Sequence, residues 1–370
     1  MLHRALSALS HAALLPVRRA AQLVQTGQAH QHFLLPVLNG ALGDQLAAAH
    51  DPRAIQLSFR RDGHDLAVAD LQLGNERQKT VVFVHGLMGD ELIWQTSTPA
   101  PPDSPPRYGP RLAAEAGVRV LYVRYNSGLH ISQNGRALSY LLSELVRTYP
   151  SAVGELVLVG HSMGGLVIRS AGYYGSTRTE QVAVDTEQAP DEQANASQEL
   201  PIDKAPWLAY LRTVFLLGVP HDGSYVEQNS AAAERLLRRL NVLPTRLLSE
   251  LLARRSDGIK DLGQARLVDA DWQHSAADDP APSRTPVPLL PGVAYHVLVG
   301  GWLRTGRAQA LRDYFGDGLV GTASGQALGQ LPGAKPLPPG TTLRTARFEA
   351  RHHGGLLHDE AVYCYLHRWL

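Results

Sequence analysis

Residues 156–165, LVLVGHSMGG, decide the fold of this 370-residue chain. The first four, LVLV, form a short apolar run of the kind found in strands buried on both faces of a parallel sheet. Residues 160–164 fit the pattern Gly-x-Ser-x-Gly, and residues 166–169 continue with a helical pattern. A serine on a tight turn between a strand and a helix is the context that a nucleophile elbow requires. The stretch therefore predicts an α/β fold with a reactive Ser162.

Gly160 and Gly164 support this interpretation, because they flank the serine on both sides. Glycine removes the side chains that would collide with the neighbouring strand and helix at such a turn. The hydroxyl of Ser162 is then presented at the edge of the sheet, beside the amino end of a helix that favours negative charge. The pentapeptide alone is weakly specific, so its place between strand and helix carries the prediction.

Similar apolar runs recur along the chain and alternate with helical patterns, which predicts a doubly wound, mostly parallel sheet. The runs are residues 81–84, 120–123, 156–159, 214–217 and 296–299, with a last strand expected at 343–348. The helical patterns include residues 135–148, 165–174 and 360–369. Ahead of them, residues 55–59 and 66–73 read as two strands of a hairpin connected through residues 60–63.

A second glycine-rich loop, residues 85–89 with the sequence HGLMG, follows the strand at 81–84. Loops after parallel strands meet at the carboxyl edge of the sheet, where doubly wound folds bind ligands. In such a loop, of which Gly86 is a candidate site glycine, a backbone amide can point inwards beside the one at Met163. The backbone amides of Leu87 and Met163 are the candidate donors of an oxyanion hole. An ordinary strand-to-helix turn is the alternative interpretation.

These motifs, together with GVPH at residues 218–221, resemble those of α/β-hydrolase lipases and esterases. Within that superfamily the chain looks similar to bacterial lipase-like proteins related to the GPI inositol-deacylase hydrolase domain. The resemblance covers residues 55–370. It implies a catalytic triad in the chain order Ser, Asp, His, with water as the usual acyl acceptor.

The general base must be a histidine downstream of the serine, on a loop that reaches the sheet edge. His352, His353 and His358 all lie between the last expected strand and the last expected helix. The C-terminal pattern of the family, a histidine followed after two residues by Leu-Leu, assigns the base to His353. His352 remains its main competitor.

The acid of the triad is assigned to Asp317, because residues 317–320, DGLV, look like the Asp-Gly-x-Val loop of the family. On residue chemistry alone, an aspartate between two glycines is more often a turn residue. Asp222 keeps the same chain order and is the alternative acid. It stands where these lipases commonly have Pro-His-His-Gly, a departure that bears on substrate preference.

The domain organisation expected from the sequence is an N-terminal helical extension at residues 1–50 and an α/β-hydrolase domain at residues 51–370. Residues 176–206 are polar and acidic and predict a mobile insertion. Residues 225–270 hold leucines at helical spacing and predict a helical cap or lid over an acyl pocket. The alternative is that these leucines pack on the sheet.

Composition argues against several function classes. Thirty-five Lys and Arg stand against 34 Asp and Glu, so the charge gives no reason to expect a nucleic-acid partner. Cys364 is the only cysteine, which excludes an intramolecular disulfide and a cysteine-rich zinc site. Because the histidines show no metal-ligand spacing, we expect no metal and no cofactor.

No stretch approaches about 18 consecutive apolar residues, so no transmembrane helix is expected. Pro16 interrupts the apolar part of the first 25 residues, which favours an amphipathic helix over a secretory signal. The sequence predicts a cytoplasmic protein, with peripheral membrane contact through the cap as a further hypothesis.

The expected function is hydrolysis of a carboxylic ester with a lipid-like acyl group, through an acyl-enzyme on Ser162. Two alternatives stay open, namely an acyltransferase with the same triad and a catalytically silent protein that binds a lipid or a partner. The sequence sets neither the acyl length nor the head group of the substrate.

Overall fold

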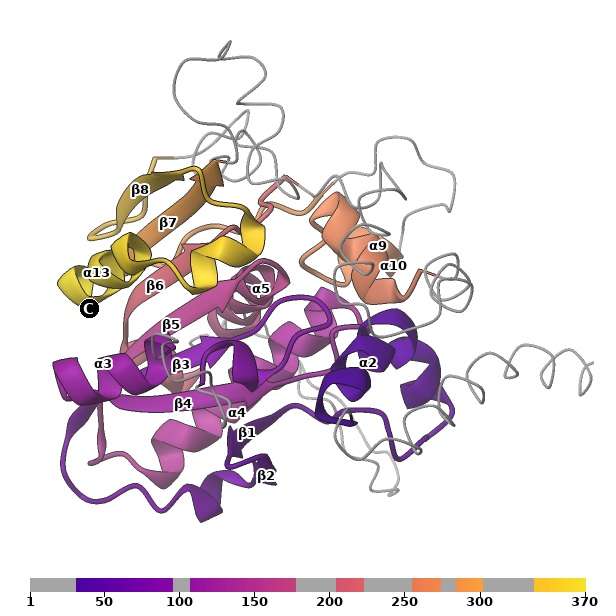
Figure 1. Cartoon of the computed structure of the whole chain (residues 1–370), viewed down its shortest axis with the longest axis horizontal. Helices are drawn as coiled ribbons and strands as arrows, with labels where there is room; N and C mark the ends of the chain where they lie inside the picture. The colour runs from indigo at the N-terminus through magenta and orange to yellow at the C-terminus, as the bar shows by residue number, and fades with distance from the viewer. Residues whose placement is uncertain (1–30, 96–106, 178–203, 223–254, 274–283, 302–335) are drawn as a thin grey trace, which may run out of the picture.

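The structure, a computed structural model, describes residues 31–95, 107–177, 204–222, 255–273, 284–301 and 336–370. Within these residues the chain forms an eight-stranded sheet with helices packed against it (Figure 1). The order of the strands in the sheet is β2-β1-β4-β3-β5-β6-β7-β8. The strands are β1 (Ser58–Arg61), β2 (His64–Leu66), β3 (Gln78–Val84), β4 (Arg119–Arg124), β5 (Val153–His161), β6 (Leu211–Leu217), β7 (Ala294–Gly301) and β8 (Thr342–Glu349).

From β4 to β8 every neighbouring pair of strands is parallel, and the antiparallel strands β1 and β2 form the edge beyond β4. The mostly parallel sheet predicted from the apolar runs is confirmed. In the register of β3 with β5, Val84 pairs with Gly160, so the loops that follow these two strands leave the sheet side by side.

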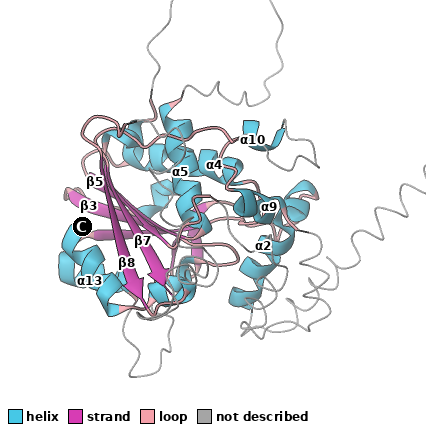
Figure 2. Cartoon of the chain, turned by 90° about the horizontal axis from the view of Figure 1, so that it is seen from above, coloured by secondary structure: helices cyan, strands magenta, loops and turns pink. Residues whose placement is uncertain are grey.

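The helices lie in layers on the two faces of the sheet, with one group at its edge (Figures 1 and 2). Helices α4 and α5 pack together on one face, while α3 and α13 cover the other. Helix α2 packs against α9. The helices are α2 (Gln31–Ala48), α3 (Tyr108–Ala116), α4 (Ile131–Thr148), α5 (Met163–Ser176), α9 (Asp257–Gln264), α10 (Ala270–Gln273) and α13 (Glu360–Trp369).

The core explains why the central strands are apolar without alternation. Successive side chains of a strand point to opposite faces of the sheet. In β3, Val82 and Val84 belong to the cluster beneath α4 and α5, whereas Val81 and Phe83 belong to the cluster beneath α3 and α13. All four side chains are 0% exposed, so both faces of the strand must be apolar.

The predicted hairpin is present, but its second strand is shorter than expected. Strand β2 ends at Leu66, and the next residues, Val68–Leu71, form a 3-10 helix instead of the expected continuation to residue 73. Val68 and Leu71 are both buried, and a 3-10 helix places residues three apart on the same side. Burial of this pair therefore overrides the strand pattern.

The proline-rich stretch at residues 98–110 is typical of a surface loop, but its last residues belong to helix α3. Pro110 lies in the first turn of that helix, where a missing N–H costs no hydrogen bond. Residues 98–106 of this stretch lie outside the described residues.

Several other predictions also fall on residues outside the described ranges, namely most of the insertion at 176–206, residues 225–254 of the cap, the Asp317 loop and residues 1–30. Helix α9 lies in the last part of the expected cap, and α2 lies in the expected N-terminal extension. No helix in the described ranges is both long enough and apolar enough to cross a membrane.

Candidate active site

Ser162 connects β5 directly to α5 and has a backbone conformation that is rare for a residue with a side chain. Its φ is 52° and its ψ is −124°. The turn is held by two hydrogen bonds, in which the Ser162 amide donates to the Leu217 carbonyl at 2.9 Å and the Gly165 amide donates to the Ser162 carbonyl at 3.0 Å. Strain of this kind costs of the order of 1–3 kcal/mol and is concentrated at functional sites.

The two glycines beside the serine are required by close backbone contacts. A Cβ on Gly160 would lie 2.7 Å from the Cα of Gly165, and a Cβ on Gly164 would lie 2.3 Å from the His85 carbonyl oxygen. The strand, the helix and the loop after β3 therefore pack backbone against backbone. The requirement for glycine at both predicted elbow positions follows from this packing.

The HGLMG loop lies against the elbow. A Cβ built on Gly86 would be 3.1 Å from the Cβ of Ser162 and 3.1 Å from the Nδ1 of His161. The loop is closed by a hydrogen bond from the Gly89 amide to the Gly86 carbonyl at 3.2 Å, and Met88 has a left-handed φ of 57°. Thus the structure brings together the two motifs that the sequence placed at one sheet edge.

The predicted oxyanion-hole donors, the backbone amides of Leu87 and Met163, lie in the two segments that meet at this junction. The Met88 amide donates to the Ser127 hydroxyl at 3.0 Å, whereas no acceptor among the described residues takes the amide of Leu87. Met163 is the first residue of α5, and the first amides of a helix have no partner inside it. The assignment of the amides of Leu87 and Met163 to an oxyanion hole stays a prediction, with which these contacts agree.

His85 fixes the start of this loop through both of its ring nitrogens. Nδ1 donates to the Gly86 carbonyl at 2.8 Å, and Nε2 accepts from the Tyr125 amide at 3.2 Å. The Tyr125 hydroxyl donates to the His85 carbonyl at 2.9 Å, and the two rings stack with their centroids 4.2 Å apart. Burial lowers the pKa of His85 to about 4, so its ring is neutral. No sequence motif indicates this role for His85.

His353 begins a 3-10 turn, His353–Leu357, that follows strand β8. Its side chain is buried, and its ring centroid lies 4.5 Å from that of His161, the residue before Ser162. The Nε2 of His161 donates to the His353 carbonyl at 3.3 Å, which links the two loops. Burial and the neighbouring His353 hold the pKa of His161 well below its usual range.

The two neighbouring histidines are engaged elsewhere. His352 is exposed and caps the 3-10 turn, with its Nδ1 accepting from the Gly355 amide at 3.0 Å. His358 contacts the guanidinium of Arg107, and partial desolvation together with that charge lowers its pKa to about 4. Of the three candidates on this loop, His353 is the buried one beside the elbow.

The acid of the triad is not resolved by these contacts, because Asp317 lies outside the described residues. The alternative acid, Asp222, follows β6, and its carboxylate accepts a hydrogen bond from Arg284 at 3.2 Å. The two side chains are each 37% exposed, so this ion pair faces solvent. Both assignments therefore remain predictions.

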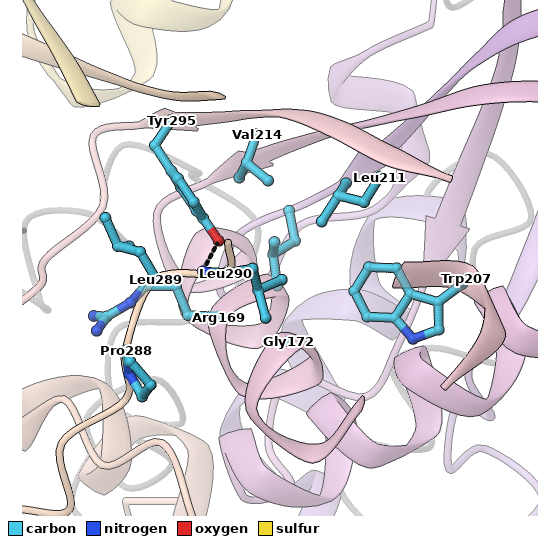
Figure 3. Close-up of a pocket in the computed structure, with 10 residues that line it drawn as sticks. Arg169, Gly172, Trp207, Leu211, Val214, Pro288, Leu289, Leu290 and Tyr295 are labelled. Atoms are coloured by element: carbon cyan, nitrogen blue, oxygen red, sulfur yellow. Dashed lines mark hydrogen bonds between the residues drawn. The ribbon is translucent and has the colours of Figure 1, made fainter. Parts of the chain in front are cut away.

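A pocket on the α5 side of the sheet is distinct from the predicted site (Figure 3). Its polar feature is Arg169, whose buried guanidinium donates to the Val287 carbonyl at 3.2 Å and contacts Nδ1 of His221 at 3.4 Å. Figure 3 also shows the hydrogen bond from the Leu290 amide to the Tyr295 hydroxyl. The lining residues are Ile168, Arg169, Gly172, Trp207, Leu211, Val214, Pro288, Leu289, Leu290 and Tyr295, and no predicted site residue is among them.

No group of three or more His, Cys, Asp or Glu within the described residues is arranged to hold a metal ion. The functional features at this sheet edge are thus a serine, a buried histidine and backbone amides. Such a set can perform nucleophilic attack with general-base assistance and can stabilise an oxyanion.

The comparison with protein families agrees with the architecture. A model of the alpha/beta hydrolase family matches residues 81–362. No curated protein matches the sequence. The closer relation to the GPI inositol-deacylase hydrolase domain is not shown and stays a prediction.

Among solved structures, the mature lipase BlEst2 of Bacillus licheniformis is 16% identical, covers 85% of this chain and 97% of its own, and has a TM-score of 0.43. EstA from Clostridium botulinum is 14% identical, covers 80% of this chain and 87% of its own, and has a TM-score of 0.44. An esterase from Thermogutta terrifontis is 14% identical over 85% of this chain and 88% of its own, with a TM-score of 0.38.

Proposed function

The chain belongs to the alpha/beta hydrolase family, and we propose that it is a serine hydrolase that cleaves carboxylic esters with a lipid-like acyl group. The observation that carries the proposal is the conformation of Ser162, a buried serine with a φ of 52° at a strand-to-helix turn. Strain at a serine beside a glycine-rich loop and a buried histidine supports a nucleophile.

In the proposed reaction, the Ser162 oxygen attacks the ester carbonyl while His353 takes the hydroxyl proton. The tetrahedral oxyanion accepts hydrogen bonds from the amides of Leu87 and Met163. Collapse of this intermediate breaks the bond to the alcohol, which leaves with the proton from His353. Water, activated by His353, then attacks the acyl-enzyme and releases the acid. Asp317 orients His353 in both steps.

The location of the two amides supports the oxyanion part of this mechanism. Both belong to backbone segments fixed by neighbouring hydrogen bonds, so little reorganisation is needed when charge develops on the substrate. In other enzymes, one such donor contributes about 2.7–4 kcal/mol to transition-state stabilisation. The neutral ring of His161 beside His353 adds no positive charge that would oppose formation of an imidazolium.

The preference for a lipid-like acyl group rests on the resemblance to lipases and on the expected cap at residues 225–270. The same cap motivates the hypothesis of peripheral membrane contact.

The identity of the acyl acceptor is the chemical difference between a hydrolase and an acyltransferase. Product analysis in the presence of glycerol distinguishes them, because acyl transfer yields a glyceride and hydrolysis yields only the free acid.

The test of the proposed nucleophile is hydrolysis of p-nitrophenyl butyrate and p-nitrophenyl laurate by the wild type and by Ser162→Ala. Ser143→Ala is a matched control, because Ser143 is also a buried serine but lies in α4 and donates to the Ser139 carbonyl. We expect the loss of at least about 10³-fold in kcat for Ser162→Ala, and activity near wild type for the control. The ratio of laurate to butyrate turnover tests the acyl preference.

The assignments of base and acid are tested with paired variants. His353→Ala should abolish turnover whereas His352→Ala should not, and Asp317→Asn should be far more damaging than Asp222→Asn. If neither ester is hydrolysed, labelling with a fluorescent phosphonate replaces turnover as the readout. Failure of folded wild-type protein to label at Ser162 would refute the proposal.

A further inference from the structure

The loop that follows β4, residues 125–128 with the sequence YNSG, contacts the HGLMG loop. The side chains of Tyr125, Asn126 and Ser127 are each 1% exposed. Its contacts reach three segments distant in sequence, namely the HGLMG loop, α2 and α9. Buried polar side chains are hydrogen-bonded in most proteins, and here two of these bonds connect the loop to the HGLMG loop and to α2.

The most direct of these contacts is the hydrogen bond from the Met88 amide to the Ser127 hydroxyl at 3.0 Å. It fixes the orientation of the peptide plane between Leu87 and Met88, because peptide units are rigid and planar. Met88 has a φ of 57°, a conformation that needs support in a residue with a side chain. The Leu87 amide belongs to the preceding peptide plane, so its direction depends on this bond.

Asn126 anchors the loop on its other side. Its Nδ2 donates to the Gly43 carbonyl of α2 at 2.9 Å, and its Oδ1 accepts from the Gly128 amide at 3.0 Å. A Cβ on Gly43 would lie 1.7 Å from that Oδ1, so the side chain is wedged against the backbone of α2. Helix α2 also contacts the HGLMG loop directly, since a Cβ on Gly40 would lie 2.3 Å from Cγ of Met88.

We propose that Ser127 is a positioning residue of the oxyanion hole and that α2 acts through it to hold the HGLMG loop in place. The inference rests on the proposed function and assigns a role to residues 31–48 of the N-terminal extension. Ser127 touches no reacting atom. It acts by keeping the Met88 amide turned away from the oxyanion and the Leu87 amide available to it.

Loss of the Ser127 hydroxyl leaves the partly buried Met88 amide without its acceptor, and the turn with a left-handed Met88 can relax. The Leu87 amide then shifts relative to the Met163 amide. Because the oxyanion exists only in the transition state and the intermediate, the change should lower kcat and leave KM almost unchanged.

The experiment compares Ser127→Ala with Ser143→Ala, which removes a buried serine hydroxyl from α4 at a distance from this loop. We expect kcat for p-nitrophenyl butyrate to fall about 10-fold or more in Ser127→Ala, with KM within about 2-fold of the wild type. The two variants should have similar melting temperatures. A kcat for Ser127→Ala that matches that of Ser143→Ala overturns the proposal.

The part assigned to α2 has its own variant, Gly43→Ala, with Gly74→Ala as the control because a Cβ on Gly74 would meet nothing within 4 Å. Gly43→Ala displaces Asn126 and should lower kcat as Ser127→Ala does, whereas the control should not. An active Gly43→Ala with unchanged kcat refutes the role of α2. If Gly43→Ala does not fold, the decision rests on Ser127→Ala.

The rate of phosphonate labelling at Ser162 separates this inference from the proposed function. If the wild type does not label, both the proposed function and the positioning role of Ser127 are refuted. A wild type that labels, together with a Ser127→Ala variant that labels at the same rate, leaves the nucleophile in place and refutes the positioning role.

Discussion

Gly164→Ala should inactivate the enzyme while a similar substitution two turns along the same helix does not. The methyl group that this change adds would point at the strand before the HGLMG loop, 2.3 Å from the His85 carbonyl oxygen and 2.5 Å from the Val84 carbonyl oxygen. Both atoms are backbone, so neither can move aside by a change of rotamer. Helix α5 must therefore shift away from the loop.

The size of that shift sets the expected effect. A contact of this kind is essentially never shorter than 3.0 Å, so the gap between helix and strand must widen by roughly 0.7 Å in a close-packed region. The movement separates the Met163 amide from the Leu87 amide. A misplacement of about 1 Å can cost about 10²-fold in rate, and the overpacking itself costs about 1–3 kcal/mol of stability.

Gly172→Ala is the matched control, because Gly172 also lies in α5 and is buried. Its Cβ would lie 3.1 Å from Cδ1 of Leu290, the flexible end of a side chain. In the helix interior, alanine is favoured over glycine by about 1 kcal/mol, so the control should be close to neutral in stability. The assay is kcat and KM for p-nitrophenyl butyrate, together with chemical denaturation of each variant.

The refuting result is a folded Gly164→Ala variant whose kcat is within about 3-fold of the wild type, since the predicted displacement of the amide should cost far more. A loss of activity that is equal in Gly172→Ala would also contradict the reasoning. In that case the damage would come from any added methyl group in α5 and not from the contact with the HGLMG loop.

Two predictions concern stability. Arg60 and Glu91 are 5% and 3% exposed and form an ion pair at 2.9 Å. Arg60→Met leaves the Glu91 carboxylate buried without this partner, so it should lower the free energy of unfolding, measured by urea denaturation, by about 3–5 kcal/mol. The double variant with Glu91→Leu should recover part of that loss. His85 has a pKa of about 4 in the folded chain against 6.5 for the free side chain. As the pH falls, the unfolded chain therefore binds a proton at this histidine before the folded chain does. The stability of the folded chain should then fall as the pH drops below 6.5. Between neutral pH and pH 5 the loss from this residue should be about 2 kcal/mol, and His85→Gln should flatten the dependence by that amount.

The sequence predicted the parts of the fold that local patterns determine. Continuous apolar runs identified the parallel strands, because a strand covered on both faces must be apolar at every position. The elbow was predicted for the same reason, since strand, serine turn and helix are adjacent in sequence. The 3-10 helix at Val68–Leu71 was missed because burial of two residues, which is a tertiary effect, decided it.

The functional side chains were predicted less completely than the fold. Ser162 and His353 could be named from motifs, and the structure places His353 beside the residue that precedes the serine. The roles of His85 and Ser127 could not, because their hydrogen-bond partners are 40 and 39 residues away. Only the folded chain shows that these distant residues meet.

One signal in the sequence could have indicated these contacts between distant segments. It is the presence of glycines at helix and loop positions where no turn requires them. Around the HGLMG loop a Cβ would meet a neighbouring segment at 3.1 Å or less at each of Gly40, Gly43, Gly86, Gly164 and Gly258. For Gly258 of α9 the nearest atom is the Ser127 carbonyl oxygen, at 2.1 Å. Segments that pack through glycine bring their backbones together and leave little room for side-chain adjustment. The HGLMG loop is therefore packed against α2, α5 and the loop after β4, and α9 packs in turn against the loop after β4. The oxyanion hole that we propose there would be positioned before the substrate arrives.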